Sequence, residues 1–250
     1  MSSKQRLLEL NARLAQNLTD KGVEATADET TTALVNKVAD IQTGSADLIP
    51  YVKSLTFSSA ISEITDDITV HLEHIGNIFQ LFYNCYLYCP KITVYISEKC
   101  TNMGHAFRIS SLDTKSTIKE IEIVGDTSKI NTANQAFMNR TSIERIIGEF
   151  DFSSCTNATD MFLQCENLKE FYPKADTIGT SVNFASCSKL VLECAKSILL
   201  GLKNYSGTEN EFINKVTFHS DVWIMLDAEG NTAPDGTTWR DYTENKGWNN

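Results

Sequence analysis

An eight-residue motif that ends in phenylalanine recurs along the chain and restricts its fold more than any other feature. CTNMGHAF and CTNATDMF are nearly identical, and three degraded copies share their length and last residue. The copies are IGNIFQLF (75–82), CTNMGHAF (100–107), INTANQAF (130–137), CTNATDMF (155–162) and TIGTSVNF (177–184). Their final residues Phe82, Phe107, Phe137, Phe162 and Phe184 are separated by 25, 30, 25 and 22 residues. Such a period predicts a solenoid, in which each repeat forms one coil that stacks on its neighbours.

The residues after each phenylalanine are also regular. In several coils a cysteine comes three residues later, an aliphatic residue six residues later, and a run with β character begins three residues beyond that. These positions hold Cys85, Cys165 and Cys187, then Ile143, Leu168 and Leu190, then Ile146 and Phe171. A four-residue insertion shifts the roles to Cys89 in the first coil, and RISSLDTKST (108–117) lengthens the second. After Phe137 the cysteine position holds Arg140.

Short runs with β character lie between these anchors. The runs are ITVHL (68–72), ITVYI (92–96), IEIV (121–124) and IIGEFDF (146–152). The first three alternate or are rich in β-branched residues, as strands with one buried face are. KEFYPK (169–174) is a weaker fifth strand, because Pro173 cannot donate to a ladder.

The seven cysteines are best explained as core residues of the coils. Cys100 and Cys155 open the motif, and Cys85, Cys165 and Cys187 follow the phenylalanine. The count is odd, no C-x-x-C pair occurs and no secretion signal is evident, so a disulfide framework is the weaker interpretation. A metal site is the rival interpretation, but no histidine or second cysteine recurs at ligand spacing. We expect packing, because a small, soft thiol fits a tight corner.

The pattern Ile/Cys-x-x-x-x-x-Ala/Met-Phe-x-x-Cys-x-x-Leu-x-x-Ile resembles the BspA-like leucine-rich repeat, whose units commonly read IGxxAFxxCxxLxxIxIP. IGNIFQLFYNC (75–85) and CTNATDMFLQCENLKEF (155–171) carry the resemblance most clearly, and it covers residues 60–190. It implies an α/β repeat fold, a curved leucine-rich-repeat solenoid with a parallel β-sheet along one face. The irregular steps and Arg140 depart from the family pattern and imply a short, divergent array.

Residues 1–45 are predicted to form a helical hairpin before the solenoid. Residues 3–20 carry an apolar stripe at helical spacing, and Thr26 with Glu29 forms a capping box before a second helix. The candidate attachment or oligomerisation residues are Leu7, Leu10, Leu14, Leu18, Leu34, Val38 and Ile41. Two short helices bury little alone, so they fold back onto the solenoid, self-associate as a homo-oligomer such as a trimer, or dock on a partner. The sequence leaves these alternatives open.

Residues 188–250 are expected to close the far end of the solenoid, which we assign to residues 46–187. SKLVLECAKSILLGL (188–202) has a helical pattern, and NKVTFHSDVWIML (214–226) reads as a strand with an apolar patch before a Trp-rich tail. This order, with its YSG and KGW segments, is similar to the C-termini of repeat-bearing structural proteins from phages of Gram-positive hosts. The amino-terminal helix–KGVEAT–helix is similar to segments of such phage tail and fibre proteins.

Composition argues against two classes of partner. The net charge is −10, from 22 basic and 32 acidic residues, and no window concentrates lysine and arginine, so we expect no nucleic-acid partner. No run of 18 apolar residues occurs, so no membrane insertion is expected. The opening MSSKQRLLELNARL also lacks the apolar core of a signal peptide.

No motif points to catalysis, a metal or a cofactor, and we expect none of the three. His71 and His74 are candidate metal ligands together with Glu73, but strand positions three apart face opposite sides and no further ligand can be named. DAEGNTAPDG (227–236) alternates oxygen ligands, yet Thr232 stands where an EF-hand needs glycine. No nucleophile elbow or phosphate-binding glycine loop occurs. Glycoside hydrolysis stays an alternative, since its two carboxylates need no local motif.

The remaining candidate site is the outward face of the predicted strands. If the first apolar residue of each strand points inward, the residues one and three places later point outward. One outward column is Thr69, Thr93, Glu122, Ile147 and Tyr172, and the other is His71, Tyr95, Val124, Glu149 and Lys174. We select His71, Tyr95, Glu122, Glu149, Tyr172 and Lys174 as candidate binding residues. Mixed aromatic and charged groups on a rigid sheet suit recognition of a protein or glycan, although a neighbouring subunit that covers this face is the alternative.

The sequence thus leads to the hypothesis of a non-enzymatic structural protein of a phage virion, such as a tail-fibre or baseplate protein. Its amino-terminal helices would bind other virion proteins, and its solenoid would bind a host cell-surface glycan or protein or a neighbouring virion protein. The expected location is the virion, after assembly in the host cytoplasm. One alternative is a cellular leucine-rich-repeat interaction scaffold or adhesin, for which a cytoplasmic location is expected. A weaker one is a tail-spike enzyme that degrades glycans.

Overall fold

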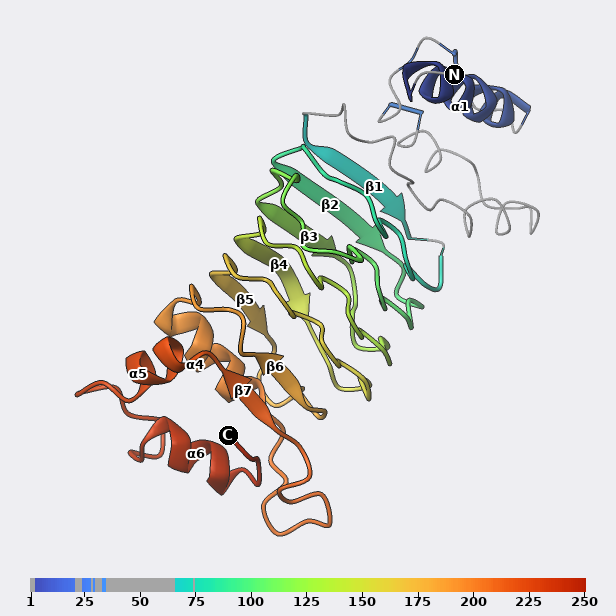
Figure 1. Ribbon diagram of the computed structural model, residues 1–250. Coiled ribbons are helices and arrows are strands. Elements are labelled where there is room, and N and C mark those ends of the chain that lie inside the picture. Colours follow the sequence, from blue (N-terminus) through green and yellow to red (C-terminus); the bar gives the residue numbers. More distant parts are fainter. Residues whose placement is uncertain (1–2, 21–23, 28, 30–32, 35–65, 74) are drawn as a thin grey trace.

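The computed structural model describes residues 3–20, 24–27, 29, 33–34, 66–73 and 75–250, and its central part is a parallel β-solenoid (Figure 1). One sheet holds β1 (Ile68–Leu72), β2 (Lys91–Ile96), β3 (Glu120–Val124), β4 (Arg145–Phe150) and β5 (Glu170–Pro173) in sequence order. Every neighbouring pair of these strands is parallel. The predicted fold class is confirmed, and each of the five predicted runs contains a strand.

The inward column of the sheet is the one that the sequence predicts. Ladder pairs join Ile68 to Ile92, Ile92 to Ile121, Ile121 to Ile146 and Ile146 to Phe171, and all five side chains are buried. A register slip of one residue would turn this column to solvent. Burial of these large apolar side chains therefore fixes the register where each strand begins.

The turns between strands stack as regularly as the strands do. Single parallel bridges link Asn77, Asn102, Thr132 and Asn157 in successive coils. The residue two places before each of the first four motif phenylalanines adopts a left-handed conformation, with φ between 53° and 58° at Gln80, His105, Gln135 and Asp160. Backbone hydrogen bonds cross from coil to coil here, for example from Phe107 N to Ala136 O at 2.7 Å. The repeated motif therefore encodes one turn that the first four coils share, whereas the fifth copy ends in the strand β6.

The motif phenylalanines form a continuous stack through the core. Ring centroids of successive members are 5.3, 5.5, 5.9, 4.6 and 5.6 Å apart along Phe82, Phe107, Phe137, Phe162, Phe184 and Phe218. Each such pair contributes about 0.5–1.5 kcal/mol beyond the burial of its area. The first five rings are those that the motif identifies. Phe218 extends the stack from outside any copy of the motif.

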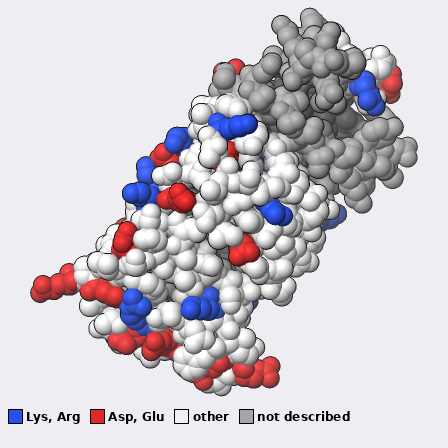
Figure 2. All heavy atoms as spheres, viewed as in Figure 1, with Lys and Arg blue, Asp and Glu red and all other residues white. Residues whose placement is uncertain are grey.

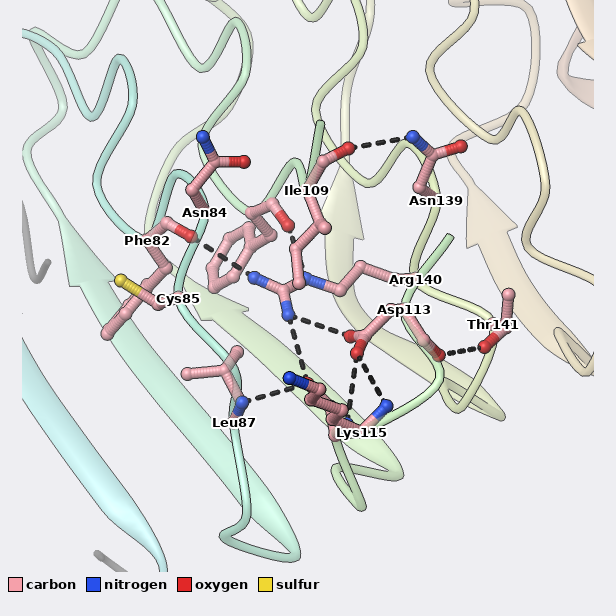
Figure 3. A network of polar contacts seen from close by, with 12 residues as sticks. Phe82, Asn84, Cys85, Leu87, Ile109, Asp113, Lys115, Asn139, Arg140 and Thr141 are labelled. Atoms are coloured by element: carbon pink, nitrogen blue, oxygen red, sulfur yellow. Dashed lines mark hydrogen bonds and ion pairs between the residues drawn. The ribbon is translucent and has the colours of Figure 1, made fainter. Parts of the chain in front are cut away.

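In three coils, the side chain three residues after the motif phenylalanine donates a hydrogen bond to a backbone carbonyl of the preceding coil. Cys165 Sγ lies 3.2 Å from Phe137 O, and Cys187 Sγ lies 3.8 Å from Phe162 O. Arg140 at the equivalent position donates from Nε to Phe107 O. Its Nη2 also reaches Phe82 O at 3.1 Å, two coils away (Figure 3). One arginine thus donates to two carbonyls. In the intervening coil the equivalent position is Ser110, which lies in the insertion and contacts Tyr83 and Asn84 instead.

The insertion at 108–117 supplies the counter-charge for this arginine. Asp113 Oδ2 accepts from Arg140 Nη1 at 2.9 Å, and both side chains are fully buried (Figure 3). The second Asp113 oxygen accepts from the backbone N–H of Ser116 at 2.9 Å. The Ser116 hydroxyl in turn accepts from Leu87 N at 2.8 Å. A buried ion pair with all of these hydrogen bonds ties the insertion to the neighbouring coils.

The C-terminal cap combines helices with a second small sheet. It holds β6 (Val182–Phe184), α4 (Leu192–Gly201), β7 (Val216–Phe218), α5 (Ser220–Leu226) and α6 (Trp239–Asn245). β6 and β7 pair in parallel, and α4 packs beside β5 at the end of the main sheet (Figure 1). The predicted helix at 188–202 and the strand after it are confirmed. The expected apolar patch after that strand is the helix α5, which buries Val222, Trp223 and Leu226.

At the other end, α1 (Ser3–Asp20) confirms the first predicted helix. Leu18 and Leu34 are buried together with Ala15, and half-buried Leu14 packs against this cluster and against the solenoid core. Thr26 N donates to Glu29 Oε1 at 2.7 Å, as a capping box requires. The side chains of Leu7 and Leu10, and residues Val38 and Ile41, lie outside the described set. Among the helices that are described, none is long and apolar enough to span a bilayer.

Replacing Arg140 should destabilise the protein strongly. We expect Arg140→Met to lower the free energy of unfolding by about 3–5 kcal/mol, because it leaves the Asp113 carboxylate buried without a counter-charge. Urea unfolding followed by circular dichroism measures the change. The matched control is Arg145→Met, which removes a solvent-exposed pair with Glu120 and should change the unfolding midpoint far less, because water screens the pair. Equal unfolding midpoints for the two variants would contradict the role of the buried pair.

Candidate functional site

The outward face of the sheet carries two columns, as the sequence predicts. Ladder pairs align Thr69, Thr93, Glu122 and Ile147 in one column, and His71, Tyr95 and Val124 in the other. These seven side chains are half-buried, in contrast to the buried inward column. The structure therefore brings His71, Tyr95 and Glu122 of the candidate residues onto one surface.

His71 and Tyr95 form an aromatic pair on this face. Their ring centroids are 4.5 Å apart and their planes differ by 9°, so the rings stack flat. His71 Nδ1 also lies 2.9 Å from Glu73 Oε1, which orients the imidazole. His74 lies outside the described set, and no group of three or more His, Cys, Asp or Glu side chains suits a metal ion within it. These contacts give His71 a role in shaping the surface.

Glu122 is the centre of a polar cluster beside that pair. Its Oε2 accepts from Lys91 Nζ at 2.7 Å and from the Thr93 hydroxyl at 3.0 Å. The hydrogen bond from Lys91 holds the pKa of Glu122 below its usual value, and the same bond raises the pKa of Lys91. The cluster is therefore charged but internally compensated.

Further ion pairs follow the edge where the strands begin. Lys91, Glu120, Arg145 and Glu170 are ladder neighbours of alternating charge, and Arg145 pairs with Glu120. Just before the strands, Glu144 contacts Lys119 at 2.9 Å and Lys169 at 2.6 Å. Figure 2 shows this mixture of basic and acidic side chains along the strand starts. Sequence reasoning missed this row, although the register that it used places these residues side by side.

A bulge separates the last three candidate residues from the others. The β4–β5 register shifts between Ile146 and Phe150, and Gly148 sits there with φ of 151°. A Cβ at Gly148 would lie 2.6 Å from Ile123 O, so only glycine permits this approach. The regular column therefore stops before Glu149, whose Oε2 lies 3.8 Å from Lys174 Nζ. Tyr172, which is 42% exposed, remains on the outward side of β5.

The cysteines belong to the core and not to this face. All seven are free and buried, which confirms the expected core packing; five of them occupy the repeat positions. Burial raises the pKa of Cys85, Cys89, Cys165 and Cys194 to about 12. A thiol that stays protonated at neutral pH is a poor nucleophile. The outward face instead offers aromatic rings, hydroxyl groups and compensated charges, which are groups for binding.

The thiols should resist modification in the folded protein. We expect iodoacetamide at about pH 8 to leave all seven unlabelled, because the thiolate is the reactive form and burial disfavours it. Intact-protein mass spectrometry counts the labels. The same treatment in guanidinium chloride is the control and should label every cysteine. Rapid labelling of the native protein would show that the thiols are exposed.

The ion pairs of Glu144 should give stability a measurable pH dependence. Hydrogen bonds from Lys169 and Lys119 lower the pKa of Glu144 from 4.5 to about 2. Because the folded pKa is depressed, the contribution is present above pH 4.5 and is lost as the pH falls towards 2. The difference in melting temperature between wild type and Glu144→Gln should therefore shrink over that range. Glu166→Gln, at an exposed position with no ion pair in the described structure, should show no such trend.

Comparison with known proteins agrees with this architecture. Neither a curated protein nor a solved structure matches the chain. Residues 54–173 match a family described as "Mycoplasma protein of unknown function, DUF285". The matched segment contains all five strands of the main sheet. The DUF285 domain at 54–173 and the stacked parallel coils are together consistent with a BspA-like repeat protein.

Proposed function

We propose that this chain is a non-enzymatic binding protein that uses the outward face of its main sheet to contact a protein or glycan on a cell or particle surface. The observation that carries the proposal is the in-register surface of β1–β3. Stacked His71 and Tyr95 lie there beside the Thr93–Glu122–Lys91 cluster. These groups are held by a rigid ladder, so little conformational entropy is lost when a partner binds.

We place this function on a phage particle, as a tail-fibre, baseplate or other attached protein. The support is the similarity of both chain ends to phage structural proteins. In this setting residues 1–45 attach the chain to other virion proteins or make a trimer. Several copies then present the sheet face together, and multivalency strengthens weak individual contacts.

Variants on the sheet face test the binding role. Val124→Arg places a long charged side chain in the middle of the outward column, and we expect binding to host cells to fall at least about tenfold, since a lost complementary contact costs about 1.4 kcal/mol or more. Flow cytometry of fluorescently labelled protein on cells of the source culture measures this. Thr159→Arg, which makes the same kind of change at an exposed turn, is the matched control. Equal binding by both variants would remove the sheet face from the proposal.

Immunogold microscopy tests the location. Antibody against residues 46–250 should label particles from the source culture at one fixed place, and deletion of residues 1–45 should abolish the label. A tail-tip position supports adsorption to the host, and a head position supports decoration. Antigen found only in the cell fraction would exclude the virion location while leaving the binding assay to judge the sheet face.

A cellular adhesin or scaffold is the second candidate, because the matched family is described from Mycoplasma, a cellular organism. An adhesin or scaffold would use the same sheet face without being attached to a phage particle. A cellular protein should remain functional and monomeric without residues 1–45. Size-exclusion chromatography with light scattering, applied to the full chain and to the truncation, separates the two candidates.

A further inference from the structure

A second cluster of aromatic and polar groups lies on the turns, away from the strands. It takes Phe79 and Tyr83 from the coil of Phe82, and His105 and Arg108 from the next coil. The His105 ring meets Phe79 edge-on at 5.5 Å and Tyr83 edge-on at 6.3 Å. Arg108 lies over the Tyr83 ring, with its central guanidinium carbon 5.6 Å from the centroid. The four side chains thus form one contiguous surface that spans two coils.

The Arg108 guanidinium orients His105 through one of its ring nitrogens. Arg108 Nη1 donates to Nδ1 at 3.1 Å, since a guanidinium carries only donors. Burial, and then the charge of Arg108, lower the pKa of His105, so the neutral ring that accepts from arginine is favoured. His105 therefore acts as a neutral support that orients Arg108.

Arg108 differs from the other arginines of the solenoid. Arg140 and Arg145 are each paired with a carboxylate, at Asp113 and Glu120. Among the residues that the structure describes, no carboxylate pairs with Arg108, although the chain has a net charge of −10. A half-buried guanidinium held by a neutral imidazole and an aromatic ring keeps its positive charge uncompensated. Such a group is suited to a planar anion from outside.

The groups around Arg108 are suited to a sugar. Phe79 is 43% exposed and offers an apolar ring face. The Tyr83 hydroxyl lies 2.9 Å from the Ser110 hydroxyl, and Asn84 Oδ1 accepts from Ser110 N at 2.7 Å. Gly104 permits the close packing beneath, because a Cβ there would approach Asn134 Oδ1 to 2.6 Å and Phe79 Cδ2 to 3.5 Å. A ring face, paired hydroxyls and a cation thus lie within one patch.

We propose that this turn-side cluster binds an acidic saccharide, with the sugar carboxylate on the Arg108 guanidinium and a face of the sugar ring against Phe79. The hydroxyls of Tyr83 and Ser110 lie beside the cation, where they donate to the carboxylate or to the sugar hydroxyls. This site is separate from the sheet face and does not depend on the function proposed for it. It would give the chain a glycan preference set by charge.

Titration of the full-length protein with tri-galacturonate and with maltotriose tests this, because the two oligosaccharides have the same length and differ in carboxylates. Chemical-shift changes in ¹H–¹⁵N spectra report binding. We expect tri-galacturonate to bind and maltotriose to bind at least about tenfold more weakly, since maltotriose has no carboxylate to accept the charge-assisted hydrogen bonds of Arg108. Equal binding of both sugars, or no binding of tri-galacturonate, would overturn the proposal.

Variants locate the site and separate it from folding. Arg108→Gln should abolish the preference for tri-galacturonate, Arg108→Lys should keep part of it, and Phe79→Ala should weaken binding. Arg145→Gln, which removes a paired arginine from the strand edge, should bind as the wild type does. Unchanged affinity in Arg108→Gln would overturn the assignment. Acetate serves as a competitor that carries a carboxylate but no sugar ring. If acetate displaces tri-galacturonate at an equal concentration of carboxylate groups, the proposed recognition of the sugar ring is overturned.

Discussion

The stack of phenylalanine rings is the interaction on which the rest of the structure depends. From Phe82 to Phe218 the ring centroids stay between 4.6 and 5.9 Å apart, although the sequence steps vary widely. Because one ring anchors each coil, extra residues are accommodated as loops and do not disturb the stack. The strands consequently stay in register, and so do the surfaces that they carry. The stack also joins the solenoid to its cap, since Phe218 comes from β7.

Arg140 and the insertion at 108–117 are two departures from the repeat that compensate each other. The insertion displaces a donor that Phe82 O would otherwise receive from the next coil, and Arg140 provides it from two coils away. A buried guanidinium alone would be costly, but the insertion itself contributes Asp113. Sequence reasoning identified both irregularities as separate features. It could not connect them, because the contact between Arg140 and Asp113 occurs once and follows no periodic pattern.

The parts of the fold that repeat could be predicted, and the parts that occur once could not. Every second residue of a strand with one buried face must be apolar. This alternation located the inward column and both outward columns as far as Ile147. The bulge at Gly148 depends on a close approach to Ile123 O, which the alternation of apolar and polar residues does not reveal. Helices α5 and α6 have seven residues each, too few for a clear helical period. Phe218 was missed because its preceding residues do not resemble the motif.

The two sides of the coil therefore differ in what they offer a partner. Stacking fixes the inward positions, so differences in recognition arise only at outward and turn positions. On the sheet face the cations near β2–β5 already have carboxylate partners, and a ligand gains little from charges that it must first separate. Under the proposed function, selectivity there would rest on the rings of His71, Tyr95 and Tyr172 and on the shape of the ladder. On the turn side, no carboxylate among the described residues pairs with Arg108, so we expect charge to select the ligand. One rigid stack would then present one surface that selects by shape and another that selects by charge.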